Sequence, residues 1–232
     1  MQENQQAPEK QVKIQGPVET APLSVHSVFH TIQGEGPFAG RPCVFIRLAG
    51  CNLQCNFCDT DYTDGRRVAT VNEILCDVIN SIPEGYPECP KLVVITGGEP
   101  FRQPIGDLIR TLNDNDVHVQ IETNGTLYQP GVSYTWSVRE AVRRGYKVTQ
   151  EQWAHSLEID NPLLTIVCSP KAGGVARKLY PHIDAYKYVV EAGCIDAEDG
   201  LPTLALRHPC KPRVARPHAG FASIQPASTT YL

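Results

Sequence analysis

Three cysteines on one short segment are the residues best suited to take part in chemistry. Cys51, Cys55 and Cys58 follow the apolar run 44–48 in the segment CNLQCNFC, a C-x3-C-x2-C spacing. Three thiolates on one loop can bind three corners of a [4Fe–4S] cluster and leave the fourth iron without a protein ligand. An open metal position is where chemistry takes place, whereas a fully ligated one is usually structural. The spacing therefore predicts a catalytic iron–sulfur centre.

Zinc is the alternative metal for these cysteines. A C-x2-C pair is common in zinc sites, and Cys43 or His30 could supply a fourth ligand. Such sites usually have a second ligand pair further along the chain, and the sequence shows no clear one. The iron–sulfur interpretation is therefore favoured, and a non-catalytic zinc-binding protein stays open as the alternative.

The strands and helices that would position this loop are predicted from apolar runs that alternate with segments of helical spacing. Apolar, β-branched runs predict strands at 25–32, 43–48, 92–96, 117–122, 164–168, 186–190 and 221–224. TVNE at 70–73 is typical of a capping box, with apolar residues at helical spacing after it, and a second helix is expected from Pro104. Strands that alternate with helices favour a parallel α/β sheet.

Four segments with functional residue types lie at the ends of predicted strands. They are the cysteine loop, GGEP at 97–100, ETNG at 122–125 and SPK at 169–171. In parallel α/β folds the ligand-binding loops gather at the carboxyl ends of the strands. A lone GGEP could be a plain turn, but glycines also admit a close backbone approach and a carboxylate can accept from a cation. Their common placement predicts one shared site.

Composition limits the domain organisation and the compartment. With 232 residues the chain suggests one large domain, with a disordered tail at 1–22, a main domain at 23–232 and an insertion of unknown role at about 127–161. No run approaches a membrane span, and the first twenty residues lack the apolar stretch of a signal peptide. Nine cysteines without an export signal favour a reducing compartment, so we expect a cytoplasmic protein.

The net charge of the chain indicates whether nucleic acid is an expected partner. The formal net charge is −4 and no basic block occurs, so direct nucleic-acid binding has little support.

The chain resembles the radical S-adenosylmethionine (SAM) superfamily, whose cluster loop has the same cysteine spacing with an aromatic residue, here Phe57, before the last cysteine. The resemblance implies a [4Fe–4S] cluster whose open iron is chelated by SAM. An electron from the cluster would cleave the sulfonium to a 5′-deoxyadenosyl radical, so that the cofactor performs the difficult step. It also implies an α/β fold, a partial parallel (β/α) barrel. The GGEP segment matches the superfamily motif that binds the methionyl ammonium.

A narrower resemblance, to the 7-carboxy-7-deazaguanine synthase family, comes from the flanking motifs. These are TIQGEG at 31–36, GRP at 40–42, FIRLAGC at 45–51, CDT at 58–60, TGGEP at 96–100, IETNGT at 121–126 and CSPK at 168–171. The resemblance implies a radical lyase that converts 6-carboxy-5,6,7,8-tetrahydropterin to 7-carboxy-7-deazaguanine with loss of ammonia, in queuosine biosynthesis. It also implies Mg²⁺, an electron donor such as flavodoxin, and a homodimer.

The same resemblance implies roles for individual residues. The cluster ligands would be Cys51, Cys55 and Cys58, and Thr60 would bind Mg²⁺. The positions implied for SAM are Phe57, Cys58, Asp59, Gly98, Glu99, Glu122, Ser169, Pro170, Lys171 and Gln225. The positions implied for the pterin are Ile32, Gln33, Gly34, Arg47 and Thr96. A guanidinium such as that of Arg47 suits a substrate carboxylate.

The carboxyl end departs from the family pattern. SIQP at 223–226 matches a family strand, but Ala227 and Ser228 replace its continuation, so we expect a barrel without the usual C-terminal helix and strand. We expect a chain of this kind to need a partner subunit or to fold less stably than full family members. A glycyl-radical activase shares the cysteine spacing and stays open as an alternative, although QGEG at 33–36 and CDT at 58–60 favour the pterin enzyme.

Overall fold

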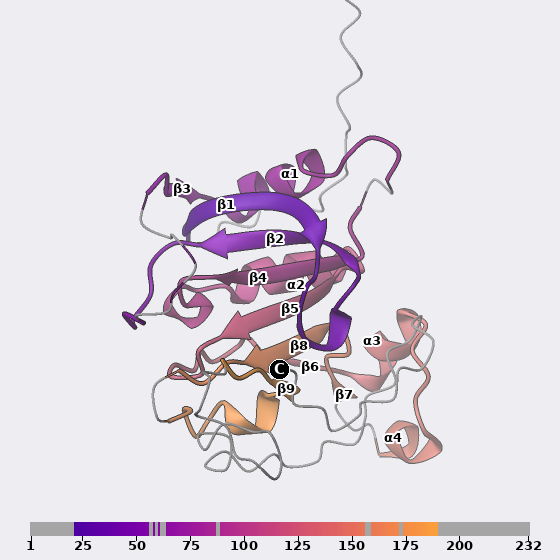
Figure 1. Ribbon diagram of the computed structural model, residues 1–232. Helices are drawn as coiled ribbons and strands as arrows, with labels where there is room; N and C mark the ends of the chain where they lie inside the picture. The colour runs from indigo at the N-terminus through magenta and orange to yellow at the C-terminus, as the bar shows by residue number, and fades with distance from the viewer. Residues whose placement is uncertain are drawn as a thin grey trace, which may run out of the picture.

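A seven-stranded sheet with the order β3-β1-β2-β4-β5-β8-β9 forms the frame of the molecule (Figure 1). The computed structural model describes residues 21–55, 58, 60, 64–86, 89–155, 159–171 and 174–189. The strands are β1 Leu23–Ile32, β2 Pro42–Leu48, β3 Arg67–Ala69, β4 Leu92–Gly97, β5 His118–Thr123, β8 Leu164–Cys168 and β9 Ala185–Tyr186. From β2 to β9 all neighbours are parallel, and across the described strands the sheet is open. The predicted α/β fold with a partial parallel barrel is confirmed.

The first strand differs from the expected parallel arrangement. β1 pairs antiparallel with both β2 and β3. The connection between β1 and β2, residues 33–41, holds only the 3-10 turn η1 Gly36–Phe38, and parallel neighbours need a longer crossover. Among the described residues of the predicted strand 186–190, which end at 189, only Tyr186 belongs to a strand, namely β9. The expected strand 221–224, the departure of the carboxyl end and the tail up to residue 20 lie outside the described residues.

Two amphipathic helices, α1 Val71–Asn80 and α2 Gly106–Asp114, pack on one face of the sheet. The predicted capping box is present, since Thr70 Oγ1 accepts from Glu73 N at 3.3 Å and Thr70 N donates to Glu73 Oε2 at 2.7 Å. The second helix begins at Gly106, two residues after the expected start. None of the helices in the described part of the chain is long and apolar enough to cross a membrane.

The opposite face, here called the inner face, changes from apolar to polar along the strands. Figure 1 shows η1 in front of this face and both helices behind the sheet. Near the amino ends of the strands, Phe38 of η1 packs with Cys43, Leu92 and Val94. Because side chains alternate along a strand, the same face continues through Phe45 to Arg47 on β2, and through Val94 to Thr96 on β4. The polar end of the inner face is therefore the carboxyl end of the sheet.

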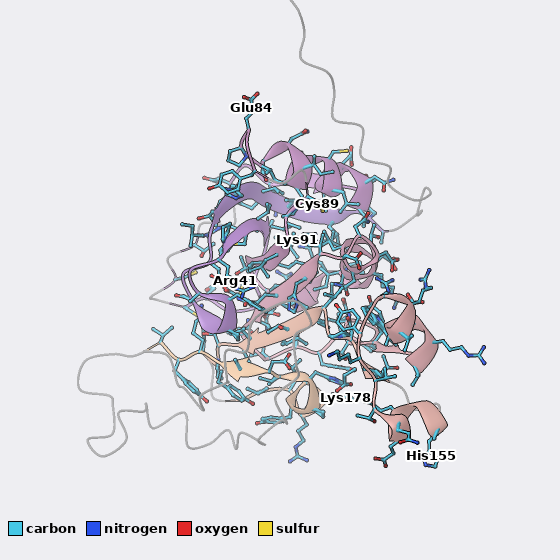
Figure 2. The ribbon with its side chains drawn as sticks, turned by 90° about the vertical axis from the view of Figure 1, so that its right-hand side faces the viewer. Arg41, Glu84, Cys89, Lys91, His155 and Lys178 are labelled. Carbon is cyan, nitrogen blue, oxygen red and sulfur yellow. The ribbon has the colours of Figure 1, made fainter. Side chains whose placement is uncertain are left out.

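The proposed insertion folds into small elements of its own. They are β6 Thr135–Trp136, α3 Val138–Arg143, α4 Gln150–Ala154 and β7 Ile159–Asp160, with β6 and β7 paired antiparallel. The short helix expected at 138–144 is α3. Figure 2 looks onto the amino ends of the parallel strands, where Arg41 and Lys91 mark the starts of β2 and β4, and places His155 beyond α4 at the edge. The insertion thus lies at the end of the sheet opposite the cysteine loop (Figure 1).

Asn113, fully buried at the end of α2, joins this insertion to the sheet. Its Nδ2 donates to the carbonyl oxygens of Val117 at 3.0 Å and Leu163 at 3.1 Å. Its Oδ1 accepts from Tyr134 Oη at 2.8 Å and Asn161 Nδ2 at 2.7 Å. One amide therefore satisfies four polar groups, three of them on buried residues, from three segments of the chain.

We expect Asn113→Ala to lower the free energy of unfolding by about 3 kcal/mol, because it leaves buried donors and acceptors unpaired. Urea denaturation measures this value. The matched control is Asn115→Ala, which removes one exposed hydrogen bond from Nδ2 to Thr111 O and should cost less than about 1 kcal/mol. Equal losses in the two variants would contradict the role assigned to Asn113.

Candidate active site

The cysteine loop, residues 50–60, leaves the carboxyl end of β2. Cys51 and Cys55 are partly buried, Cys58 is exposed, and all three are free thiols. Cys58 N donates to Cys55 O at 3.1 Å, which folds the loop back on itself. Phe57 and Asp59 lie outside the described residues. Among described residues no group of three or more histidine, cysteine or acidic side chains is gathered to hold a metal ion.

The proposed zinc ligands Cys43 and His30 lie far from this loop. Cys43 stands near the start of β2, and His30 is paired with Val44 beside it. Five residues of extended strand between Cys43 and Leu48 span about 16 Å. Burial, with a smaller effect of the Glu122 charge, also raises the pKa of Cys43 to about 12, which disfavours a metal-binding thiolate. The structure therefore does not assemble the zinc set.

The GGEP turn, residues 97–100, is hydrogen-bonded to the start of the cysteine loop. Gly98 N donates to Leu48 O, and Glu99 N donates to Gly50 O, both at 2.9 Å. A Cβ atom on Gly98 would lie 1.9 Å from Gly50 O, and one on Gly97, where φ is +112°, would lie 2.3 Å from Leu48 O. The two glycines are therefore required because another stretch of backbone lies against them.

Glu99 ties the ends of β4 and β5 together. Its side chain is fully buried and accepts from Thr123 Oγ1 at 2.7 Å, Asn124 N at 2.8 Å and Phe101 N at 3.1 Å. Burial raises the pKa of the Glu99 carboxyl, and these hydrogen bonds together with the charge of Lys171 oppose the rise. Glu99 was expected at the cofactor; in the structure its oxygens bind the neighbouring strand end.

The SPK segment follows β8 directly. Ser169 is 5% exposed, its N donates to Thr123 O at 2.7 Å, and its Oγ is buried without a hydrogen-bond partner among the described residues. Pro170 is buried and Lys171 is half-buried. An orphaned hydroxyl at the carboxyl end of a strand is a polar group that a ligand can satisfy.

Glu122 is the centre of a second set of polar contacts, on the inner face. Its Oε1 accepts from Gln33 Nε2 at 3.0 Å and Gln120 Nε2 at 3.1 Å, and its Oε2 accepts from Thr96 Oγ1 at 3.3 Å. Lys187 Nζ lies 3.8 Å from Oε2 and also pairs with Glu35. Glu122 was predicted at the cofactor, yet the structure places it with Gln33 and Thr96, two residues predicted for the substrate.

Arg47 and Thr60 come together beside this set. Arg47 Nη1 donates to Thr60 Oγ1 at 3.2 Å, and its guanidinium lies 5.5 Å from the ring centre of Phe29. The residues predicted for a substrate carboxylate and for Mg²⁺ are thus direct neighbours. Ile32, which is 63% exposed, pairs with Pro42 at the start of β2, the end of that strand away from Arg47, and Gly34 is exposed in the connection that follows.

Sequence reasoning did not single out several residues of the site. Gln120 shares a strand face with Glu122, a period-two relation that the sequence contains. Lys187 is a charge within an otherwise apolar run, which is a usable signal. Glu35 and Asn124 lie inside the motifs at 31–36 and 122–125 without a distinguishing mark of their own. Gln225, predicted at the cofactor, lies outside the described residues.

The residues present fit an iron–sulfur cluster with SAM. Three free thiols share one loop, and Leu53 N donates to Cys51 Sγ at 3.4 Å, which suits a thiolate ligand. The orphaned hydroxyl of Ser169 suits a polar cofactor group. For Mg²⁺, the hydroxyl oxygen of Thr60 fits an ion that takes most of its ligands from water and substrate.

Comparisons with known proteins agree with this geometry. The model of the Radical SAM superfamily matches residues 45–200. The chain is 43% identical over 199 residues to the 7-carboxy-7-deazaguanine synthase of Rhodospirillum rubrum, covering 85% of this chain and 72% of that protein. The chain belongs to the 7-carboxy-7-deazaguanine synthase family. The expected family and radical SAM enzyme type are thereby confirmed.

Two further relatives support family membership. The 7-carboxy-7-deazaguanine synthase of Rickettsia prowazekii is 41% identical over 180 residues, covering 75% of this chain and 64% of that protein. The crystal structure of QueE from Escherichia coli aligns with a TM-score of 0.51 and 26% identity, covering 72% of this chain and 70% of that one. The names of the relatives favour a member of this family over a glycyl-radical activase.

Gly98→Ala should prevent normal assembly of the site, because the new methyl group would force the GGEP turn away from Gly50. Overpacking of this kind costs about 1–3 kcal/mol, and backbone has less freedom to yield than a side chain. We expect a lower unfolding midpoint in urea and less iron bound after anaerobic reconstitution.

Gly174→Ala is the control for this substitution, since a Cβ atom there has no neighbour within 4 Å in the part of the chain that the structure describes. Its stability and iron content should equal those of the parent protein. Unchanged iron binding in Gly98→Ala would show that the contact between turn and loop is dispensable.

Proposed function

We propose that this chain is a radical lyase that converts 6-carboxy-5,6,7,8-tetrahydropterin to 7-carboxy-7-deazaguanine with loss of ammonia. The observation that supports this most is spatial. The cysteine loop and the GGEP turn lie in direct contact at the carboxyl ends of β2 and β4, and the polar set of Glu122 and Arg47 lies on the inner face at the same end. A place for a radical source and a place for a polar bicyclic substrate are thus adjacent.

The inner-face residues are suited to a carboxylated pterin. We assign the substrate carboxylate to Arg47, whose guanidinium can form two parallel hydrogen bonds to it. Glu122, Gln33 and Thr96 offer acceptors and donors to the ring, which carries amide and amino groups. Gln33 is 1% exposed and is held on both sides, by Glu122 Oε1 and by Glu35 N. Because these two hydrogen bonds fix the side-chain amide of Gln33, its donor and acceptor have a defined orientation toward a ligand.

The cysteine side of the site is suited to the cofactors. A [4Fe–4S] cluster with SAM would supply, when bound, the one-electron cleavage that starts hydrogen abstraction from the substrate. We assign Cys51, Cys55 and Cys58 to the cluster. We assign Gly98 and the segment Ser169 to Lys171 to SAM, supported by the orphaned Ser169 hydroxyl. Glu99 would act on this side by holding the strand ends together rather than by direct contact.

Mg²⁺ would bind at Thr60. Its hydroxyl lies beside Arg47, so an ion there and the guanidinium would share the carboxylate of the substrate. Such an ion keeps several water ligands and needs few protein groups.

The remaining partners are proposed from the family resemblance. They are a one-electron donor such as flavodoxin, a second copy of the chain in a homodimer, and later enzymes that use the deazapurine for queuosine in tRNA.

Turnover under strict anaerobiosis tests the proposed reaction. Protein reconstituted with iron and sulfide, then given SAM, a reductant, Mg²⁺ and the carboxypterin, should release ammonia and 7-carboxy-7-deazaguanine in equal amounts. Mass spectrometry and an ammonia assay measure the two products. A reducible cluster without either product would refute the lyase assignment.

Arg47→Lys should reduce kcat/KM by roughly tenfold to a hundredfold, because a lysine cannot form the paired hydrogen bonds of a guanidinium. Steady-state turnover measures this ratio. Arg67→Lys is the control, since Arg67 pairs with Asp77 on the exposed edge of the sheet and lies outside the site. If both variants retain full activity, Arg47 does not bind the substrate carboxylate.

A further inference from the structure

A row of side-chain amides and hydroxyls joins the end of β5 to the cysteine loop. Asn124, 6% exposed, lies in the turn directly after β5. Its Nδ2 lies 3.9 Å from Cys51 Sγ and 3.0 Å from Asn52 Oδ1. Asn52 Nδ2 in turn donates to Thr126 Oγ1 at 2.8 Å, which closes the row.

The orientation of the Asn124 amide is fixed by its other bonds. Its Oδ1 accepts from Thr126 N at 2.9 Å and from Thr126 Oγ1 at 2.6 Å. An amide oxygen that faces two donors leaves the NH₂ group facing the cysteine loop. The Asn124 backbone N donates to the buried carboxylate of Glu99 at 2.8 Å, so the main chain at this turn is held as well.

Cys51 consequently has two N–H donors near its sulfur, Leu53 N and Asn124 Nδ2. In the proposed enzyme this sulfur would be the thiolate that binds iron. Hydrogen bonds to the sulfurs of an iron–sulfur cluster are among the factors that set its reduction potential. The reduced cluster carries one more negative charge than the oxidised cluster. An N–H donor near a sulfur therefore stabilises the reduced form and raises the reduction potential of the cluster.

We propose that Asn124 is a positioning residue that acts through Cys51 and raises the reduction potential of the cluster. This inference rests on the proposed function, because it requires a cluster on the three cysteines. Asn124 occupies the turn between the inner face, where Glu122 lies on β5, and the cysteine loop. One strand, β5, would therefore carry Glu122 to the substrate and, in the turn after its end, place Asn124 at the electron source.

The test is the midpoint potential of the reconstituted cluster, measured by anaerobic titration with dithionite and electron paramagnetic resonance. Asn124→Leu keeps a similar volume and excludes water but removes the N–H donor. We expect its reduction equilibrium constant to fall about tenfold, which is about 59 mV for a one-electron couple. Asn124→Ala is a second variant in case the larger side chain prevents folding, and its potential should also fall.

Asn52→Ala is the matched control. It removes two hydrogen bonds between the same turn and loop but leaves the contact from Asn124 to Cys51 in place, so its reduction equilibrium constant should change less than about twofold. Equal shifts in Asn52→Ala and Asn124→Leu would overturn the inference, as would an unshifted potential in Asn124→Leu with normal iron and sulfide content. A parent protein without any reducible cluster would overturn the proposed function and this inference together.

Discussion

The close packing of one turn against one loop is the constraint on which the site depends. β2 and β4 are parallel neighbours, so the chain leaves both of them at the same end of the sheet. The GGEP turn and the start of the cysteine loop can share this space only because Gly97 and Gly98 lack side chains, since a Cβ atom on either would collide with backbone. Glu99 extends the contact sideways to β5 through Thr123 and Asn124. Three strand ends are thereby held in one arrangement.

Much of the frame follows from local patterns. Runs of apolar residues located β1, β2, β4, β5 and β8, and the Thr70 capping box located α1. The antiparallel pairing of β1 was not anticipated, because the alternation of strands and helices indicates the parallel part of a sheet only. The connection 33–41 is too short for a crossover, and this length was the available signal.

The candidate site was predictable as a set of motifs but not as a set of contacts. Gln33 and Glu122 bond across 89 positions of sequence, and Thr96 reaches the same carboxylate from another strand. Such contacts depend on the register between strands that are distant in the chain. The motifs predicted Glu122 at the cofactor, and the structure shows it bonded to Gln33 and Thr96, two residues predicted for the substrate. The close approach of Gly97 and Gly98 to the backbone of residues 48–50 is another such contact, because it joins the ends of two strands that are distant in the chain.

The apolar half of the inner face limits how deep the site can be. Phe38 and His118 meet edge to face, with ring centres 4.6 Å apart, and with Leu92 and Val94 they fill the space between η1 and the sheet. This packing makes the inner face apolar toward the amino ends of the strands, whereas Arg47, Thr96 and Glu122 lie toward the carboxyl ends. A ligand bound to those polar side chains would lie above the packed rings of Phe38 and His118. A substitution of Phe38 would change where a bound substrate ring lies on the inner face. It would therefore change the distance between that ring and the cysteine loop.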